Sequence, residues 1–319
     1  FVIKIFLGML SDKVNLFGMG HRKPYILIGL GVQSICLVIA PFINPATAYW
    51  GFAALAFVLQ LGMALYDTCT DGLALDTTPL EEKGKIQGFM VGGRAVGVVV
   101  TASAVGLLAE NVSWAAVFWL LAALTLLPLP LVLSSKEAER PVERSFNWSA
   151  FAAFKNLRVI ALAIMGLLFF LIIAGTNQIV NPFLQEKFNI SLSTAGNFTT
   201  LWGVGAVLGG VLGGWLISKL GDRRATIGAL VVCVISILGL AFTPSLALAW
   251  PIVFVFGLAY ATYQTVYYAL AMGFTDMRIA ASMFAILMAI TNIGQGIGMP
   301  LSGLIVDKGS FTTAFLVMA

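Results

Sequence analysis

The sequence predicts an all-α protein that crosses a membrane many times and contains two related helical halves. Of its 319 residues, 60% are hydrophobic and only 10% are charged, and the mean hydropathy is +0.97. Windows of about 20 apolar residues, the length that an α-helix needs to cross a bilayer, recur along the whole chain. An internal repeat indicates the two related halves, because the motif from Gly8 to Lys13 recurs from Gly214 to Lys219.

Composition and motifs argue against several other classes of protein. The net charge is +4 and the pI is near 9.0, but the basic residues are scattered in short loops, so we expect no nucleic-acid partner. The three cysteines fall within spans and form no CxxC pair, so we expect neither a disulfide framework nor a metal site. We find no phosphate-binding GxxxxGK[ST] loop and no recognisable pairing of nucleophile and base. We therefore expect no cofactor, no direct coupling to ATP and no enzyme.

The predicted spans follow one another with short connections. Prolines close the first complete span, a charged turn separates the second from the third, and a glycine ladder at positions 205, 209 and 213 favours close packing in the sixth. The predicted spans are Pro24 to Ile43, Tyr49 to Asp76, Ile86 to Glu110, Trp114 to Ser134, Val159 to Phe183, Thr194 to Ile217, Thr226 to Phe242, Ala247 to Gly273 and Ser282 to Val306. Both chain ends interrupt apolar runs. We expect a fragment that lacks a first helix, part of a second and most of a twelfth.

A polar linker, residues 135–158, separates an N-terminal bundle at 1–134 from a C-terminal bundle at 159–319. In the linker Trp148, Phe151 and Phe154 recur at near-helical spacing, which fits either an amphipathic segment on the membrane surface or an ordinary packed helix. Fourteen of the 18 lysines and arginines fall on the side of the linker. By the positive-inside rule this side is cytoplasmic. We expect a monomeric, multi-pass integral protein of a bacterial inner membrane.

Within residues 64–97, three charged residues lie where lipid is expected, and Lys4 lies in the truncated first span. Asp67 and Arg94 are each nine residues, about 13 Å, from the charged turn between consecutive antiparallel spans, so they can pair. Asp71 lies one turn from Asp67 on the same helix face. An ionisable group inside a membrane marks a pathway or binding site by default. The alternatives are a static structural pair, and for Asp71 either a proton carrier or a solvated acid.

Polar side chains in the later spans are further pathway candidates. One face of the span from Ala247 carries tyrosines at i, i+3 and i+7 with a glutamine at i+4, which fits a cavity wall or an aromatic core. The candidates are Tyr260, Tyr263, Gln264 and Tyr267 on this face, and Asn177, Gln178 and Asn181 on the span from Val159.

The segment Gly8-Met-Leu-Ser-Asp12-Lys13, followed after a short insertion by Gly18-Met-Gly-His-Arg22-Lys23-Pro24-Tyr25, resembles the loop between the second and third helices of major facilitator superfamily transporters. The resemblance implies two pseudo-symmetric six-helix bundles. It also implies that Asp12 caps a helix starting at Ala280 to Met283 and that Arg22 engages Asp76. An insertion at residues 14–18 departs from the commonest spacing of this loop. The resemblance implies a cytoplasmic gate made of Gly8, Asp12, Arg22 and Asp76, with Gly214, Arg223 and Arg224 in the repeat.

Duplicated halves with buried charge are characteristic of secondary transporters. The sequence therefore favours alternating-access transport of a small organic solute, coupled to a proton or sodium ion. Short matches around Asp67 and Asp71 resemble the muropeptide-permease, folate/biopterin and bacteriochlorophyll-delivery branches. The run Arg22 to Tyr25 resembles glycoside/pentoside symporters. The alternative is a membrane assembly or pigment-delivery factor without a transport cycle.

Overall fold

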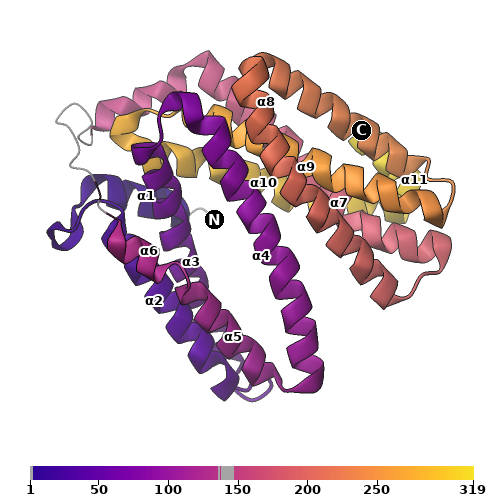
Figure 1. Ribbon diagram of the computed structural model, residues 1–319, viewed down its shortest axis with the longest axis horizontal. Coiled ribbons are helices and arrows are strands. Elements are labelled where there is room, and N and C mark those ends of the chain that lie inside the picture. The colour runs from indigo at the N-terminus through magenta and orange to yellow at the C-terminus, as the bar shows by residue number, and fades with distance from the viewer. Residues whose placement is uncertain (1–2, 136, 138–146) are drawn as a thin grey trace. The chain divides into compact units, whose positions relative to one another are not determined.

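The computed structural model describes residues 3–135, 137 and 147–319, and in this part the regular secondary structure is helical (Figure 1). Short 3-10 segments, among them η5 (Trp148–Lys155) and η6 (Met277–Ile279), join some of the helices. The helices are α1 (Ile3–Lys13), α2 (Lys23–Ile39), α3 (Tyr49–Thr77), α4 (Lys83–Asn111), α5 (Trp114–Leu126), α6 (Leu129–Ser134), α7 (Leu157–Phe188), α8 (Leu192–Ala241), α9 (Leu246–Phe274), α10 (Ala280–Lys308) and α11 (Phe311–Met318).

The helix boundaries confirm the predicted all-α membrane fold. Within the described residues, seven helical stretches are long and apolar enough to cross a membrane: α2, α3, α5 with α6, α7, α8, α9, and α10 with η6. The 50 residues of α8 would extend about 75 Å as one straight helix, far more than one crossing needs. Gly221 breaks it with φ 76° and ψ 169°, a conformation that favours glycine. The two arms correspond to the predicted spans Thr194 to Ile217 and Thr226 to Phe242.

Two segments differ from simple helices. The predicted span Trp114 to Ser134 is interrupted where α5 ends and α6 begins, because Pro128 and Pro130 lack the N–H that would continue the helix. In the linker, Trp148 and Phe151 lie in the 3-10 segment η5, with ring centroids 5.8 Å apart. A membrane-surface position for this segment stays a prediction. Linker residues 136 and 138–146 lie outside the described residues.

The chain divides into two compact units. Unit 1 consists of the residues up to Thr77, Val100–Ala153 and Thr275–Ala289; unit 2 consists of Thr78–Val99, Phe154–Phe274 and Ile290–Ala319. Each unit therefore contains helices of one sequence half and part of one helix, α10 or α4, from the other. The predicted domain limits at 134 and 159 separate the two repeated halves of the sequence rather than these two units, and they stay a prediction.

In unit 1, α2 packs along α3 and α5, and α1 packs on α3 (Figure 1). A Cβ atom at Gly29 would lie 2.7 Å from a backbone oxygen of α3, so glycine allows the two helices to touch there. Tyr25, Ile26, Leu30 and Cys69 form the buried cluster beside this contact.

In unit 2, α8 folds back along α9, and α7 and α11 pack on this pair. The predicted glycine ladder lies in this contact: added Cβ atoms at positions 205, 209 and 213 would all collide with α9. The close-packing role predicted for the ladder is confirmed.

Candidate functional site

Arg22, immediately before α2, is the centre of a buried ion cluster in unit 1. Its side chain is fully buried. Nε donates to Asp76 Oδ2 at 2.8 Å, Nη1 to Ser11 Oγ at 2.7 Å and Nη2 to Asp12 Oδ1 at 2.7 Å. Burial alone lowers the pKa of an arginine, but the carboxylates of Asp12 and Asp76 outweigh it and raise the pKa of Arg22. The guanidinium stays charged at any physiological pH.

Asp12 joins this cluster to the start of α10. Its Oδ2 accepts from the backbone N–H of Ser282 at 2.8 Å and from the Ser282 hydroxyl at 2.6 Å, and Oδ1 accepts from Ala281 N–H at 3.3 Å. A carboxylate at a helix N-terminus satisfies free N–H groups and complements the helix dipole. A Cβ at Gly8 would lie 2.9 Å from the Ala281 oxygen, which explains why α1 has glycine there. The predicted cap is confirmed.

The face of α3 that meets Arg22 is shaped to fit it. A Cβ on Gly72 would lie 2.8 Å from the guanidinium carbon. One turn away, the fully buried thiol of Cys69 lies beside Ser11 and Arg22. We call Ser11, Asp12, Arg22, Asp76 and Ser282 the Arg22 latch.

Glu137, at the start of the linker, binds the backbone beside the Arg22 latch, a contact that sequence reasoning missed. Its carboxylate accepts from the consecutive backbone N–H groups of His21 at 2.6 Å, Arg22 at 2.9 Å and Lys23 at 3.0 Å. Lys23 Nζ donates to two carbonyl oxygens at the end of α6. Gly20 has φ +111° and leaves room for the carboxylate. Only the fold reveals this contact, because Glu137 lies 115 residues from Arg22 along the chain.

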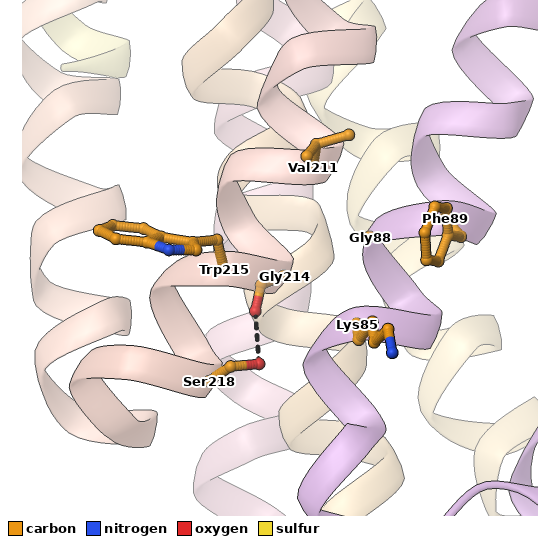
Figure 2. Close-up of a pocket in the computed structure, with 7 residues that line it drawn as sticks. All are labelled: Lys85, Gly88, Phe89, Val211, Gly214, Trp215 and Ser218. Atoms are coloured by element: carbon orange, nitrogen blue, oxygen red, sulfur yellow. Dashed lines mark hydrogen bonds between the residues drawn. The ribbon is translucent and has the colours of Figure 1, made fainter.

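The repeat of the motif in unit 2 makes different contacts. Ser218, which stands where Asp12 stands in the first copy, donates to the carbonyl of Gly214 in its own helix at 2.9 Å (Figure 2). Lys83 at the start of α4 binds Asp222 at 2.9 Å, while Arg223 and Arg224 are exposed. The sequence analysis assigned Arg223 and Arg224 to the gate, whereas the adjacent Asp222 forms the described ion pair.

The membrane acids lie on α3 as predicted. Asp67 forms an ion pair with Lys4 of α1, with side chains 22% and 12% exposed, and sequence reasoning had not assigned that partner. Asp71 is buried, one turn further along α3. Arg94 belongs to unit 2, where its guanidinium carbon lies 5.9 Å from the ring centroid of Tyr268. The Asp67–Arg94 pair therefore stays a prediction.

The tyrosine face of α9 lies mostly in the packing core of unit 2. Tyr263 and Tyr267 are fully buried; Tyr263 stacks on Phe169 with centroids 3.6 Å apart, and Tyr267 meets Phe170 edge-on. Neither hydroxyl makes a hydrogen bond within the described residues. A pathway role for this face stays a prediction, as it does for Gln264, whose amide donates to the Tyr268 hydroxyl at 3.1 Å, and for Tyr260, which packs on Trp202.

The polar groups of α7 lie towards its C-terminal end. Asn177 and Gln178 are exposed, and Asn181 donates to Thr199 of α8 at 2.8 Å. Asn177 and Asn181 also line a small cavity between α7, α8 and α9.

Known proteins with similar sequences are transporters. The anhydromuropeptide permease of Escherichia coli is 24% identical over 342 residues, which cover 99% of this chain and 67% of the permease. The sialic acid transporter NanX of E. coli is 23% identical over 245 residues, 74% of this chain and 57% of that protein. A folate-biopterin transporter of Synechocystis is 31% identical over 150 residues, 44% of this chain and 30% of that protein.

Solved structures show the same fold. The fucose:proton symporter of E. coli superposes with a TM-score of 0.75 at 18% identity, covering 100% of this chain and 84% of the symporter. The human organic anion transporter TETRAN gives a TM-score of 0.82 at 12% identity, covering 99% and 77%. The sequence also matches the family described as the Major Facilitator Superfamily over residues 1–282 and, in a second match, 162–319. The chain therefore belongs to the major facilitator superfamily and is an integral, multi-pass membrane protein.

Proposed function

We propose that this protein is a secondary active transporter that moves a small organic solute by alternating access. The observation that carries the proposal is the Arg22 latch. It ties α1 and α3, from the first sequence half, to the N-terminus of α10, from the second. A buried bond of this kind between helices of different halves acts as a gate that holds one side closed.

The chemistry of the latch suits a two-state gate. A buried ion pair adds little stability beyond an apolar contact, but removing one partner costs about 3–5 kcal/mol because a charge is left unpaired. Partial opening is therefore unfavourable, and the latch is either complete or fully solvated. Glu137 and Asp12 fix the two backbone ends that meet there. On this proposal Gly8, Asp12, Arg22 and Asp76 form a cytoplasmic gate.

The coupling ion acts at Asp67 and Asp71. A proton or sodium ion at Asp67 weakens its pairing with Lys4, since the carboxylate charge is then neutralised. Arg94 is the alternative partner for the Asp67 carboxylate in another state of the cycle, once the ion has left and the charge has returned. The polar side chains of α7 and α9 named above supply contacts to the solute. The relatives suggest sialic acid, an anhydromuropeptide and biopterin as the first solutes to test.

Uptake by proteoliposomes tests this function. Purified protein is reconstituted, and entry of each labelled solute is followed under a proton gradient, a sodium gradient or neither. We expect gradient-driven uptake that Asp67→Asn and Asp71→Asn each abolish. Asp307→Asn, at an exposed acid near the end of α10, is the matched control and should transport normally. Pigment that co-purifies without any flux would instead support the pigment-delivery alternative.

A further inference from the structure

An apolar groove runs between the first turns of α4 and the middle of α8 in unit 2 (Figure 2). The volume of this groove is about 260 Å³. The side chains of Phe89, Val211 and Trp215 line it, and these residues are 65%, 56% and 53% exposed. Large apolar side chains so exposed on membrane helices face lipid rather than protein. We call this feature the α4–α8 groove.

Polarity changes in the same direction along both walls of the groove. On α4, Lys85 lies one turn before Phe89; on α8, Ser218 lies one turn after Trp215, and Val211 one turn before it. Figure 2 shows Lys85 and Ser218 at one end of the groove and Val211 at the other. The order is thus charged or polar, then aromatic, then aliphatic. A phospholipid has the same order, from phosphate through glycerol to acyl chain, and aromatic side chains favour the interfacial level.

The charge at the polar end favours an anion. The Lys85 side chain is 64% exposed, and its ammonium has three donors. Glu82 lies 3.7 Å away with its side chain 57% exposed, a surface pair that leaves most of the ammonium open to another ligand. Lys219, Arg223 and Arg224 are exposed beside the Gly221 break of α8, beyond Ser218, and add positive charge at the polar end of the groove.

We propose that the α4–α8 groove binds one anionic phospholipid, with the phosphate at Lys85 and an acyl chain along Phe89, Trp215 and Val211. Gly88 and Gly214 lie at the helix crossing, and a Cβ at Gly88 would lie 2.8 Å from the Gly210 oxygen. The close crossing keeps the groove in one shape. A basic site between transmembrane helices near the membrane surface is a recurrent form of lipid recognition. This inference does not depend on the transported solute.

Quenching of Trp215 fluorescence by brominated lipids tests the proposal. The protein is placed in vesicles that contain phosphatidylcholine or phosphatidylglycerol carrying the same brominated chain. The chain has seven tryptophans, so the Trp215 signal is obtained as the difference between the parent protein and Trp215→Phe. One basic residue at a membrane surface contributes about 1 kcal/mol to binding an anionic lipid, so we expect phosphatidylglycerol to bind about fivefold more tightly.

Variants separate charge from shape. Lys85→Gln should abolish the preference for phosphatidylglycerol, whereas Lys308→Gln, at an exposed lysine at the end of α10, should keep it. Val211→Phe should reduce quenching by both lipids, because it narrows the groove. The proposal is overturned if both lipids quench equally in the parent, if Lys85→Gln keeps the preference, or if neither lipid quenches Trp215. It is also overturned if soluble glycerol phosphate displaces the lipid, because the site then recognises the headgroup alone.

Discussion

Replacing Arg22 with lysine should open the latch although the charge is kept. The guanidinium makes three directed hydrogen bonds, to Asp76, Ser11 and Asp12. A lysine ammonium is a single point on a flexible stem and cannot meet three partners arranged around a planar fork. We expect two contacts to be lost. Hydrogen bonds to charged groups contribute about 1.5–3 kcal/mol each, so the closed latch should lose roughly 3 kcal/mol or more.

The thiol of Cys69 measures this loss directly. It is fully buried beside Ser11 and Arg22, so a maleimide reaches it only when the latch region opens. With Cys36→Ala and Cys233→Ala in the background, Cys69 is the one thiol that remains. A shift of roughly 3 kcal/mol corresponds to about 100-fold faster labelling.

The control is a second arginine near the same segment. Arg278 binds only Asp276 among its described ion pairs and is 38% exposed, so Arg278→Lys should change the labelling rate by less than about threefold. An unchanged rate in Arg22→Lys would refute the reasoning, because the three hydrogen bonds would then not hold the region closed. Equal acceleration in both variants would indicate general destabilisation instead.

Three further outcomes follow from the same region. Glu137→Gln removes the charge that binds three backbone N–H groups and should speed Cys69 labelling about fivefold or more, since neutral hydrogen bonds are weaker by about 1 kcal/mol or more. Gly72→Ala should lower the melting temperature because its methyl group would lie 2.8 Å from the latch guanidinium, whereas Gly31→Ala, in open space on α2, should raise it or leave it unchanged. Hydrogen bonds from Arg278 lower the pKa of Asp276. The contribution of the Asp276 carboxylate to stability is therefore present at pH 7 and is lost as the pH falls through this lowered pKa. The difference in melting temperature between the parent and Asp276→Asn should accordingly shrink from pH 7 to pH 3.

The sequence was sufficient for the main partners of the first motif, because its residues resemble those of a known family. The family resemblance supplied two distant partners, Asp76 for Arg22 and the helix start at Ala280 to Met283 for Asp12, and the structure contains both contacts. The direct hydrogen bond from Arg22 to Asp12 was not predicted. The membrane-spanning helices could also be predicted from the sequence, because the bilayer sets the length and apolarity of a helix that crosses it.

Other contacts between residues far apart in the chain could not be predicted from the sequence. Lys4 was visible as a charge in a span, but its pairing with Asp67 depends on how α1 crosses α3. Glu137 looked like one of many charges in a polar linker. The tyrosine periodicity on α9 could not predict that Tyr263 stacks on Phe169, because a helical period does not identify the neighbouring helix.

The two copies of the repeated motif differ in a way that bears on how such a gate works. In the first copy a carboxylate, Asp12, caps another helix and holds a fully buried arginine. In the second copy the hydroxyl of Ser218 turns back to its own helix, and the described contact is Lys83 with Asp222, whose side chain is 48% exposed. A half-exposed pair contributes about 0–1 kcal/mol, far less than breaking a buried one costs. The described charge contacts are therefore stronger in the first copy than in the second, and the two copies do not hold their helices with equal strength. On the proposed transport cycle, opening of the gate is limited by the first copy.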